Sequence, residues 1–359
     1  MPPIRVLIVD DSELIRSLLA GILSEDPELL IVGTAVDPYD ARKKIKELDP
    51  DVITLDIEMP KMDGITFLRN LMRLRPMPVV MVSTLTTKGA EVTLEALELG
   101  AIDFITKPKL AVTENLSALS EELRQKVKHA AKANLTTINS GGVSRASVSP
   151  SVKPSSAMRP SGKVAIIAIG ASTGGTEATK TLLSSLPPNM PPIVVAQHMP
   201  DGFTRSYADR LDHLVDLAVS ELNSDGQLLE PNHVYIANGA RHFVVRSSGG
   251  VLKGYLDDSA PVNRHKPSVD VLFNSVANAV GSRSVGVLLT GMGADGAKGL
   301  GRLQEMGAKT VAQDERTSVV WGMPRIAIEH GYADEVLPLG RIGEYLIQRC
   351  YRQDMKVIH

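Results

Sequence analysis

The chain contains a single cysteine, Cys350, among its 359 residues. One cysteine excludes an intramolecular disulfide, and such a low content is typical of proteins in a reducing compartment. The sequence also lacks an apolar run long enough to cross a bilayer, and residues 1–5 show no signal-peptide pattern. We therefore expect a cytoplasmic protein without membrane insertion.

A strong charge of either sign is missing as well. The 39 Lys and Arg residues nearly balance the 41 Asp and Glu residues, so the formal net charge of -2 provides no general attraction to nucleic acid. The hydrophobic share of 43% and the charged share of 22% are typical of globular proteins. A chain of this length is sufficient for about two domains, each with its own core. We expect two folded domains and no nucleic-acid partner.

The first third of the chain alternates short apolar runs with amphipathic segments of helix length. This pattern predicts a doubly wound parallel α/β sheet, in which ligands bind at the carboxyl ends of the strands. The predicted strands are residues 4–9, 30–35, 52–55, 79–82 and 104–106. The polar residues that follow them are Asp10 and Asp11, Asp56, Ser83 and Thr84, and Lys107.

These polar residues have the composition of a phosphoryl-transfer site. Three carboxylates at neighbouring strand ends repel one another unless a cation joins them, and oxygen ligands with room for water suit Mg²⁺. Asp56 can then attack a phosphoryl donor to give an acyl phosphate, and Lys107 and a nearby hydroxyl can bind the new oxygens. A lone aspartate after a strand is more often a helix cap. The joint occurrence of these residues favours the phosphoryl site.

Together with the segment 59–64 and Pro108, these residues resemble the response-regulator receiver domain over residues 4 to about 123. The resemblance implies a flavodoxin-like fold in which Asp56 is phosphorylated. It implies that Asp10, Asp11, Asp56 and the backbone carbonyl of Glu58 hold Mg²⁺. It further implies that Lys107 binds the phosphate and that Ser83 and Phe104 are the switch residues.

The composition changes after a predicted helix at residues 115–133. Residues 139–163 are rich in Ser, Gly and Pro and contain almost no large apolar side chains, so they cannot compensate for the entropy lost on ordering. We interpret them as a flexible linker. The predicted boundaries are a receiver domain at 1–124, a helix extension and linker at 125–162, and a second domain at 163–359.

The second domain is organised around a glycine-rich turn at residues 170–175. A predicted buried strand at 164–169 precedes it and a helix at 176–186 follows, which places Ser172 at the apex of a tight turn. Gly170, Ser172 and Gly174 have the G-x-S-x-G spacing of a nucleophile elbow, and the backbone N–H of Thr173 can face an oxyanion. A capping serine in an ordinary βα turn gives the same pattern. The hydrolase interpretation therefore needs a base and an acid.

His198 is the candidate base because it follows a predicted strand at 193–197. If this strand pairs with 164–169, Ser172 and His198 lie at the same sheet edge. Asp295 follows a strand at 285–290 and Asp314 follows one at 309–313, so each is a candidate acid. We prefer Asp295 because its flanking glycines permit close backbone approach.

Two further segments carry predictions. Between residues 234 and 255, short strands separated by turn residues predict an antiparallel ribbon. The basic cluster Arg264, His265 and Lys266 precedes a predicted helix at 269–280. It is either a binding site for an acidic substrate or a solvated loop.

The order Ser, His, Asp differs from that of the α/β-hydrolases. Four segments closely resemble the catalytic domain of chemotaxis protein-glutamate methylesterases: residues 170–175, 197–200, 290–297 and 313–324. The resemblance implies a Rossmann-like hydrolase in which Ser172, His198 and Asp295 form the triad and no metal is needed. Its implied reaction is hydrolysis of glutamyl methyl esters on methyl-accepting chemoreceptors, with deamidation of receptor glutamines in many members. Asn238 departs from the family, which usually has proline there.

The resemblance also implies regulation. Phosphorylation by the chemotaxis histidine kinase would loosen a receiver that otherwise obstructs the catalytic face. A non-catalytic, phosphorylation-controlled protein-binding module, with Ser172 only a turn residue, is the alternative. A dinucleotide-dependent reductase is disfavoured because His198 occupies the position where it needs an acidic residue.

Overall fold

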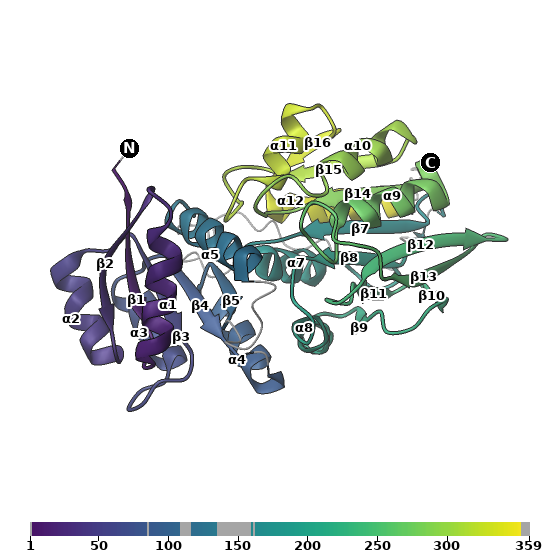
Figure 1. Cartoon of the computed structure of the whole chain (residues 1–359). Helices are drawn as coiled ribbons and strands as arrows, with labels where there is room; N and C mark the ends of the chain where they lie inside the picture. The colour runs from purple at the N-terminus through teal and green to yellow at the C-terminus, as the bar shows by residue number, and fades with distance from the viewer. Residues whose placement is uncertain (1, 85, 108–115, 135–158, 161, 353–359) are drawn as a thin grey trace, which may run out of the picture. The chain divides into compact units, whose positions relative to one another are not determined.

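The computed structural model describes residues 2–84, 86–107, 116–134, 159–160 and 162–352. The chain divides into two compact units, Met1–Asn139 and Ser140–His359, each of which is described by itself (Figure 1). The predicted linker lies almost entirely outside the described residues, and the predicted domain boundaries stay a prediction.

The first unit is built on a parallel sheet of five described strands in the order β2-β1-β3-β4-β5. The strands are β1 (Ile4–Val9), β2 (Leu29–Ala35), β3 (Val52–Asp56), β4 (Val79–Ser83) and β5 (Asp103–Thr106). The helices are α1 (Glu13–Ser24), α2 (Pro38–Leu48), α3 (Gly64–Leu74), α4 (Thr87–Glu98) and α5 (Leu116–Ala131). Strands β3 and β4 are buried throughout because helices cover the sheet, with α1 packed against α5 and α3 against α4. The predicted doubly wound sheet is confirmed.

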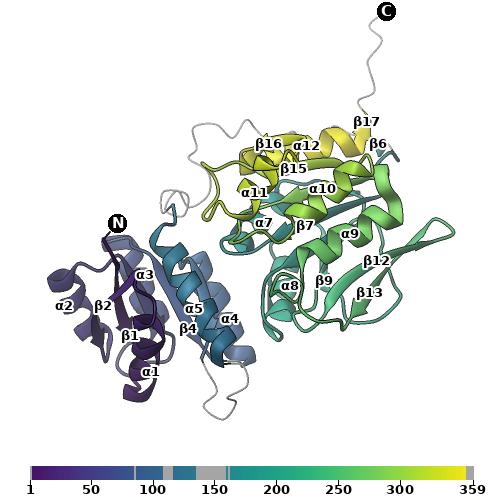
Figure 2. The same cartoon turned by 45° about the horizontal axis from the view of Figure 1, so that its top comes forward.

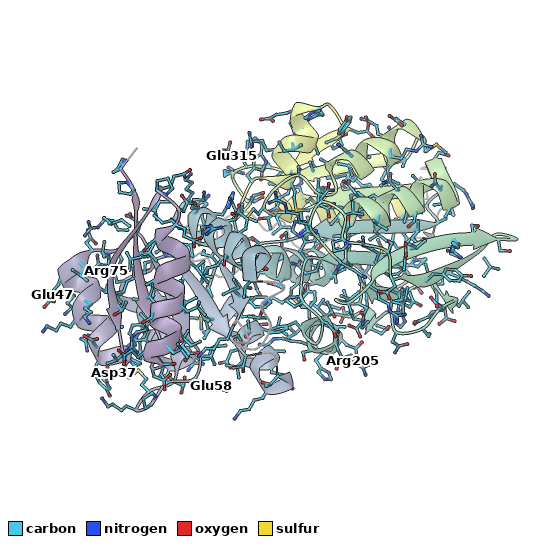
Figure 3. All side chains as sticks on the ribbon, in the orientation of Figure 1. Asp37, Glu47, Glu58, Arg75, Arg205 and Glu315 are labelled. Carbon is cyan, nitrogen blue, oxygen red and sulfur yellow. The ribbon has the colours of Figure 1, made fainter. Side chains whose placement is uncertain are left out.

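Polar side chains begin several of these helices just after a strand has ended. Ser12, Asp37, Asp63 and Thr86 each accept a hydrogen bond from a backbone N–H in the first turn of α1, α2, α3 and α4. Figure 3 labels Asp37, which also pairs with Lys61 at 2.6 Å. These caps fix where the chain turns at the carboxyl edge of the sheet.

The second unit contains a parallel sheet of seven described strands in the order β16-β15-β14-β7-β8-β11-β9. The strands are β7 (Ile166–Ala171), β8 (Ile193–Gln197), β9 (Ala218–Glu221), β11 (His233–Ile236), β14 (Ser284–Leu288), β15 (Lys309–Gln313) and β16 (Glu335–Leu337). The helices are α7 (Gly175–Ser184), α8 (Phe203–Asp212), α9 (Val269–Val280), α10 (Ala297–Glu305), α11 (Met323–Glu329) and α12 (Leu339–Cys350). The central strand β7 pairs with β8 on one side and β14 on the other.

The antiparallel ribbon begins later in the chain than predicted. Residues from Val234 belong to β11, which runs parallel to β8 and β9 within the main sheet. The ribbon consists of β12 (His242–Ser248) and β13 (Val251–Asp257), joined by Gly249 and Gly250 at positive φ, and β10 (Gln227–Leu228) extends it. A short apolar run such as that of β11 does not distinguish the two strand types, which explains the error.

The ribbon helps to place helix α9. Figure 2 shows β12 and β13 beside α9, and α9 also contacts β7 and α10. Fully buried aromatic rings, among them Tyr235, Phe243 and Phe273, fill the core on this side. This packing fixes α9 so that its first turn lies at the carboxyl edge of the sheet.

Candidate functional site

The first unit gathers buried charges at the carboxyl edge of its sheet. Asp10 is 0% and Asp56 1% exposed. Lys107 Nζ lies 3.2 Å from Asp10 Oδ2 and 2.8 Å from Asp56 Oδ2. Burial, reinforced by the charge of Asp10, raises the pKa of Asp56 to about 6 although Lys107 opposes the shift. The ionised form of Asp56 is therefore unfavourable in free energy unless further positive charge binds nearby.

The donor set at this edge fits a divalent cation. Asp10, Asp11 and Asp56 each offer a carboxylate oxygen, and these oxygens lie within 4.8 Å of one another. Three carboxylates with one lysine leave net negative charge, and hard oxygen donors suit Mg²⁺. The Glu58 side chain is exposed (Figure 3) and is not a member of this oxygen cluster, so the role of its backbone carbonyl stays a prediction.

The predicted switch residues contact other elements of the unit. Ser83 ends β4, and Thr93 Oγ1 of helix α4 lies 2.7 Å from Ser83 Oγ. Phe104 is buried in β5, and Lys126 of α5 donates to its carbonyl oxygen at 2.7 Å. Sequence reasoning missed Thr93 and Lys126, because their positions on helices carry no local motif.

We expect Asp56→Asn to stabilise the chelator-treated protein at pH 8. A carboxyl whose pKa is raised by folding stabilises the fold only in its protonated form, so its contribution is present below about pH 4 and lost as the pH rises through about 6. The difference between a pKa of about 4 in the unfolded chain and about 6 in the fold corresponds to about 3 kcal/mol, which is the upper limit of the gain. Thermal unfolding of both proteins at pH 4 and 8 measures it. An equal difference in melting temperature at the two pH values would contradict the prediction.

The second unit places Ser172 in a tight turn between β7 and α7. Ser172 N donates to the carbonyl oxygen of Thr290 at 3.0 Å, and Gly175 N donates to that of Ser172 at 2.7 Å. Gly174 has a φ of 75°, and a Cβ there would lie 2.6 Å from Val319 Cβ. The predicted strand, turn and helix around Ser172 are therefore present, and glycine is required at Gly174.

His198 lies on the adjacent strand end. Ala171 is in register with Gln197, and His198 N donates to the carbonyl oxygen of Ala171 at 3.0 Å. The buried amide of Gln197 ties the two strand ends together, because its Nε2 donates to the carbonyl oxygens of Ser172 at 2.9 Å and His198 at 3.3 Å. Parallel pairing of consecutive strands thus brings Ser172 and His198 to one edge.

The His198 ring is oriented by Asp295. His198 Nε2 donates to Asp295 Oδ2 at 2.8 Å. Nδ1 is buried and has no hydrogen-bond partner among the described residues. Because Nε2 carries the proton shared with the carboxylate, Nδ1 is the nitrogen that can accept one. This arrangement of the two ring nitrogens is compatible with His198 as the candidate base.

Asp295 is surrounded by donors. Oδ2 also accepts from Val269 N at 2.6 Å, and Oδ1 accepts from Ser268 Oγ at 2.8 Å and Asn263 Nδ2 at 2.7 Å. Burial by itself would raise the pKa of Asp295, but these bonds and the bond and charge of His198 hold it well below its usual range. Asp295 thus stays ionised.

The first turn of α9 reaches Asp295 because a glycine leaves room for it. A Cβ on Gly170 would lie 2.1 Å from Val269 Cγ1. This close approach lets the amino end of α9, which carries partial positive charge, face the carboxylate. Sequence reasoning missed Ser268 and Val269 because only the packing of α9 brings them to Asp295.

The other predicted candidates have different surroundings. Asp314 Oδ1 accepts from Thr317 N at 3.0 Å and closes a local turn. In the basic cluster, Lys266 pairs with Asp258 at 2.8 Å and Arg264 is exposed. His265 stacks on His198, with ring centroids 3.7 Å apart and planes at 10°. Of this cluster, His265 is the member in contact with the candidate triad.

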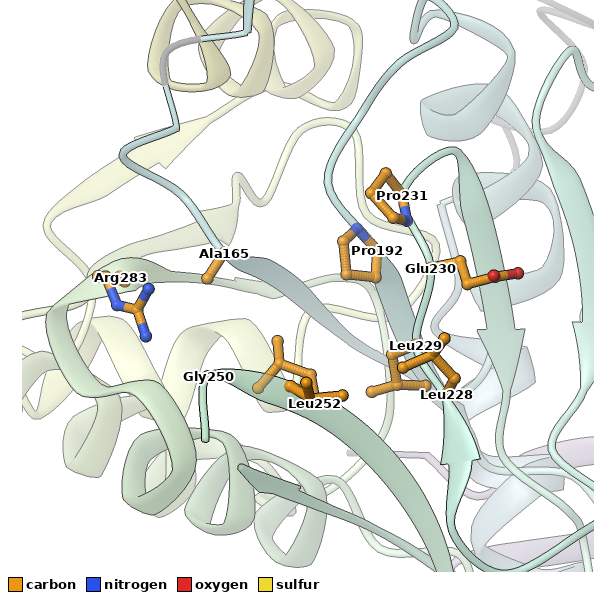
Figure 4. A pocket seen from close by; sticks show the side chains of 10 residues that line it. Ala165, Pro192, Leu228, Leu229, Glu230, Pro231, Gly250, Leu252 and Arg283 are labelled. Carbon is orange, nitrogen blue, oxygen red and sulfur yellow. The ribbon is translucent and has the colours of Figure 1, made fainter. Parts of the chain in front are cut away.

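A cavity of about 340 Å³ lies at the opposite, amino-end edge of the sheet (Figure 4). Ala165 and Pro192, which immediately precede β7 and β8, line it with Leu229, Leu252 and Arg283. Ser172 and His198 follow the same two strands at their other ends. The cavity is therefore separate from the candidate triad.

Fold and geometry define a protein with two α/β units, one with a receiver-type acidic edge and one with a Ser-His-Asp set. A family model of the CheB methylesterase matches residues 167–346, and a model of the response regulator receiver domain matches residues 6–118. The chain therefore belongs to the CheB methylesterase family with a receiver domain. None of the described helices is long and apolar enough to cross a membrane.

Named relatives match nearly the whole chain. The protein-glutamate methylesterase/protein-glutamine glutaminase of Hydrogenovibrio crunogenus is 49% identical, covering 97% of this chain and 99% of its own. The protein-glutamate methylesterase/protein-glutamine glutaminase 2 of Vibrio vulnificus is 52% identical, and the match covers 95% of this chain and 97% of that protein. The crystal structure of the Thermotoga maritima CheB methylesterase catalytic domain is 43% identical with a TM-score of 0.51, covering 52% of this chain and 98% of that one.

Proposed function

We propose that this chain is a phosphorylation-activated serine hydrolase of bacterial chemotaxis. Its substrates are glutamyl methyl esters on methyl-accepting chemoreceptors, from which it releases methanol, and receptor glutamines, which it deamidates. The observation that carries the proposal is the His198–Asp295 hydrogen bond at the sheet edge that holds Ser172. The full-length similarity to curated methylesterase/glutaminases supports the substrate class.

The reaction follows from the roles of three side chains. Ser172 Oγ attacks the ester carbonyl while His198 Nδ1 takes its proton, and Asp295 stabilises the imidazolium through Nε2. His198 then returns the proton to the departing methoxide, and methanol leaves a glutamyl-enzyme. Water attacks this ester by the same route, which regenerates Ser172 and yields glutamate. With a glutamine substrate the leaving group is ammonia.

We expect the oxyanion to form near the start of α7. The backbone N–H of Thr173 lies in the turn that leads into this helix, where the partial positive charge favours an anion. The loop that follows β14 also lies against Ser172, because a Cβ on Gly291 would be 2.8 Å from Ser172 Cβ. Backbone groups of these two segments are therefore our candidates for oxyanion stabilisation.

In the receiver, Asp56 is the phosphoacceptor and the chemotaxis histidine kinase is the donor. Lys107 already contacts Asp56 and would bind a phosphoryl oxygen, and Ser83 would supply a hydroxyl. Mg²⁺, held by Asp10, Asp11, Asp56 and the carbonyl of Glu58, would offset the negative charge of the phosphoryl group when bound. The esterase site needs no cofactor. We assign the protein to the cytoplasm, with domains at 1–124 and 163–359 and a linking segment at 125–162.

Methanol release from methylated chemoreceptor membranes tests this function. We expect the full chain to release methanol and a small phosphodonor with Mg²⁺ to increase the rate. Asp56→Asn is the matched control, and we expect it to keep the basal rate and lose the increase. Stimulation that persists in Asp56→Asn would place the phosphoryl group elsewhere. If the unaltered chain releases no methanol with or without the phosphodonor and Mg²⁺, the result would favour the non-catalytic binding module.

A further inference from the structure

An unusual turn lies beside the candidate triad. Val262 and His265 exchange two backbone hydrogen bonds, of 3.1 and 2.9 Å, around Asn263 and Arg264. These two central residues have φ values of 53° and 69°, as in a type I′ turn. Arginine rarely adopts this left-handed conformation, and here the two backbone hydrogen bonds between Val262 and His265 close the turn around it.

The side chain of Asn263 extends from this turn to two carboxylates. Its Nδ2 donates to Asp295 Oδ1 at 2.7 Å and to Asp270 Oδ2 at 2.7 Å, which uses both of its N–H groups. Asp270 is 5% and Asp295 1% exposed. The amide thus bridges two buried carboxylates, one of which orients His198.

The two carboxylates need this bridge for an electrostatic reason. Burial, together with the charge of Asp295, raises the pKa of Asp270, although the backbone N–H of Gly299 donates to its Oδ1 at 2.6 Å. Among the described residues, no lysine or arginine forms an ion pair with either carboxylate. Without the amide, each carboxylate loses a donor and the two charges repel one another more strongly.

We propose that Asn263 is a positioning residue of the hydrolase site, which bridges Asp270 and Asp295 and thereby holds Asp295 Oδ2 on His198 Nε2. The inference rests on the proposed function, because it assumes that this carboxylate orients the catalytic base. The hydrogen bonds of the Asn263 side chain go to these two carboxylates, so it acts on His198 through Asp295.

The Asn263→Gly variant tests the side-chain amide independently of the backbone conformation. Glycine adopts the left-handed conformation readily, so the turn is kept while both hydrogen bonds are lost. We expect kcat for methanol release to fall about 10- to 100-fold with little change in KM, as for loss of a hydrogen bond to a charged group. Adding Asp270→Asn removes the repelling charge, and we expect the double variant to recover part of the lost kcat.

Asn232→Gly is the matched control. Asn232 is also left-handed, with a φ of 63°, and its side chain accepts from Asn189 N at 2.8 Å ahead of β11. It lies outside the candidate triad, and we expect its variant to keep kcat.

A second readout, independent of turnover, is the proton resonance of His198 Nε2–H in protein labelled with ¹⁵N-histidine. We expect this resonance to shift in Asn263→Gly but not in Asn232→Gly.

The outcomes are distinguishable. An unchanged kcat and an unchanged Nε2–H resonance in Asn263→Gly would overturn the inference while leaving the hydrolase proposal intact. A loss of kcat with an unchanged Nε2–H resonance in Asn263→Gly would show that Asn263 acts only through the shape of the turn, which would also overturn the inference. If the unaltered chain releases no methanol, the proposed function fails, and the resonance alone then reports whether Asn263 orients the Asp295–His198 pair.

Discussion

Ser172→Ala is expected to reduce methanol release by about 10⁶-fold, the scale of loss when a hydrolase loses its nucleophile. The alanine variant lacks the oxygen that would attack the ester, and His198 then has no hydroxyl proton to accept. The backbone hydrogen bonds of the turn, to Thr290 and from Gly175, do not involve the removed oxygen. The variant should therefore fold, which its melting temperature checks.

The assay uses the full chain with phosphodonor and methylated receptor membranes. A fluorophosphonate probe provides a second measurement, and we expect it to label the unaltered protein and not Ser172→Ala. Ser185→Ala is the control, since its Oγ donates to the carbonyl oxygen of Leu182 at the far end of α7. Methanol release by Ser172→Ala at a rate near that of the control would exclude Ser172 as the nucleophile.

Asp295→Asn is expected to lower kcat by about 10⁴-fold. Within the described part of the chain, each hydrogen-bond partner of the Asp295 oxygens is a donor, so the amide nitrogen of an asparagine must face a donor. If it faces His198, the ring is forced into the other tautomer and Nδ1 carries a proton. The imidazole then cannot accept the proton of Ser172, and the imidazolium loses its counter-ion.

Asp314→Asn is the matched control for this substitution. Asp314 also follows a strand of the same sheet, but its carboxylate accepts hydrogen bonds from the backbone and side chain of Thr317. We expect this variant to keep most of its activity and its rate of probe labelling. The assignment of the acid would be reversed if Asp314→Asn lost activity and Asp295→Asn retained it.

The sequence predicted the strand-end residues because parallel sheets bring the carboxyl ends of their strands to one edge. Asp10, Asp56 and Lys107 come together in the first unit, as do His198 and Asp295 in the second. Each of these residues directly follows an apolar run or lies in the glycine-rich loop after one. Local pattern and one rule of topology were sufficient to place them.

The remaining contacts depend on tertiary packing that no local pattern reports. Asn263 and Ser268 reach Asp295 only because α9 packs against β7 at Gly170. Thr93, on the buried face of α4, is hydrogen-bonded to Ser83. The parallel pairing of β11 was missed for a related reason, since the partners of a short strand are chosen by the whole sheet.

The central position of β7 has a consequence for the order in which the site assembles during refolding. Its pairing with β8 joins segments close in the sequence, whereas Leu288 of β14 pairs with Gly170 across more than a hundred residues. Loop-closure entropy makes such distant pairings slow. We therefore expect β7 and β8, whose ends hold Ser172 and His198, to pair before β14 brings Asp295 to the same edge. Recovery of hydrolase activity should consequently lag behind recovery of helical circular dichroism.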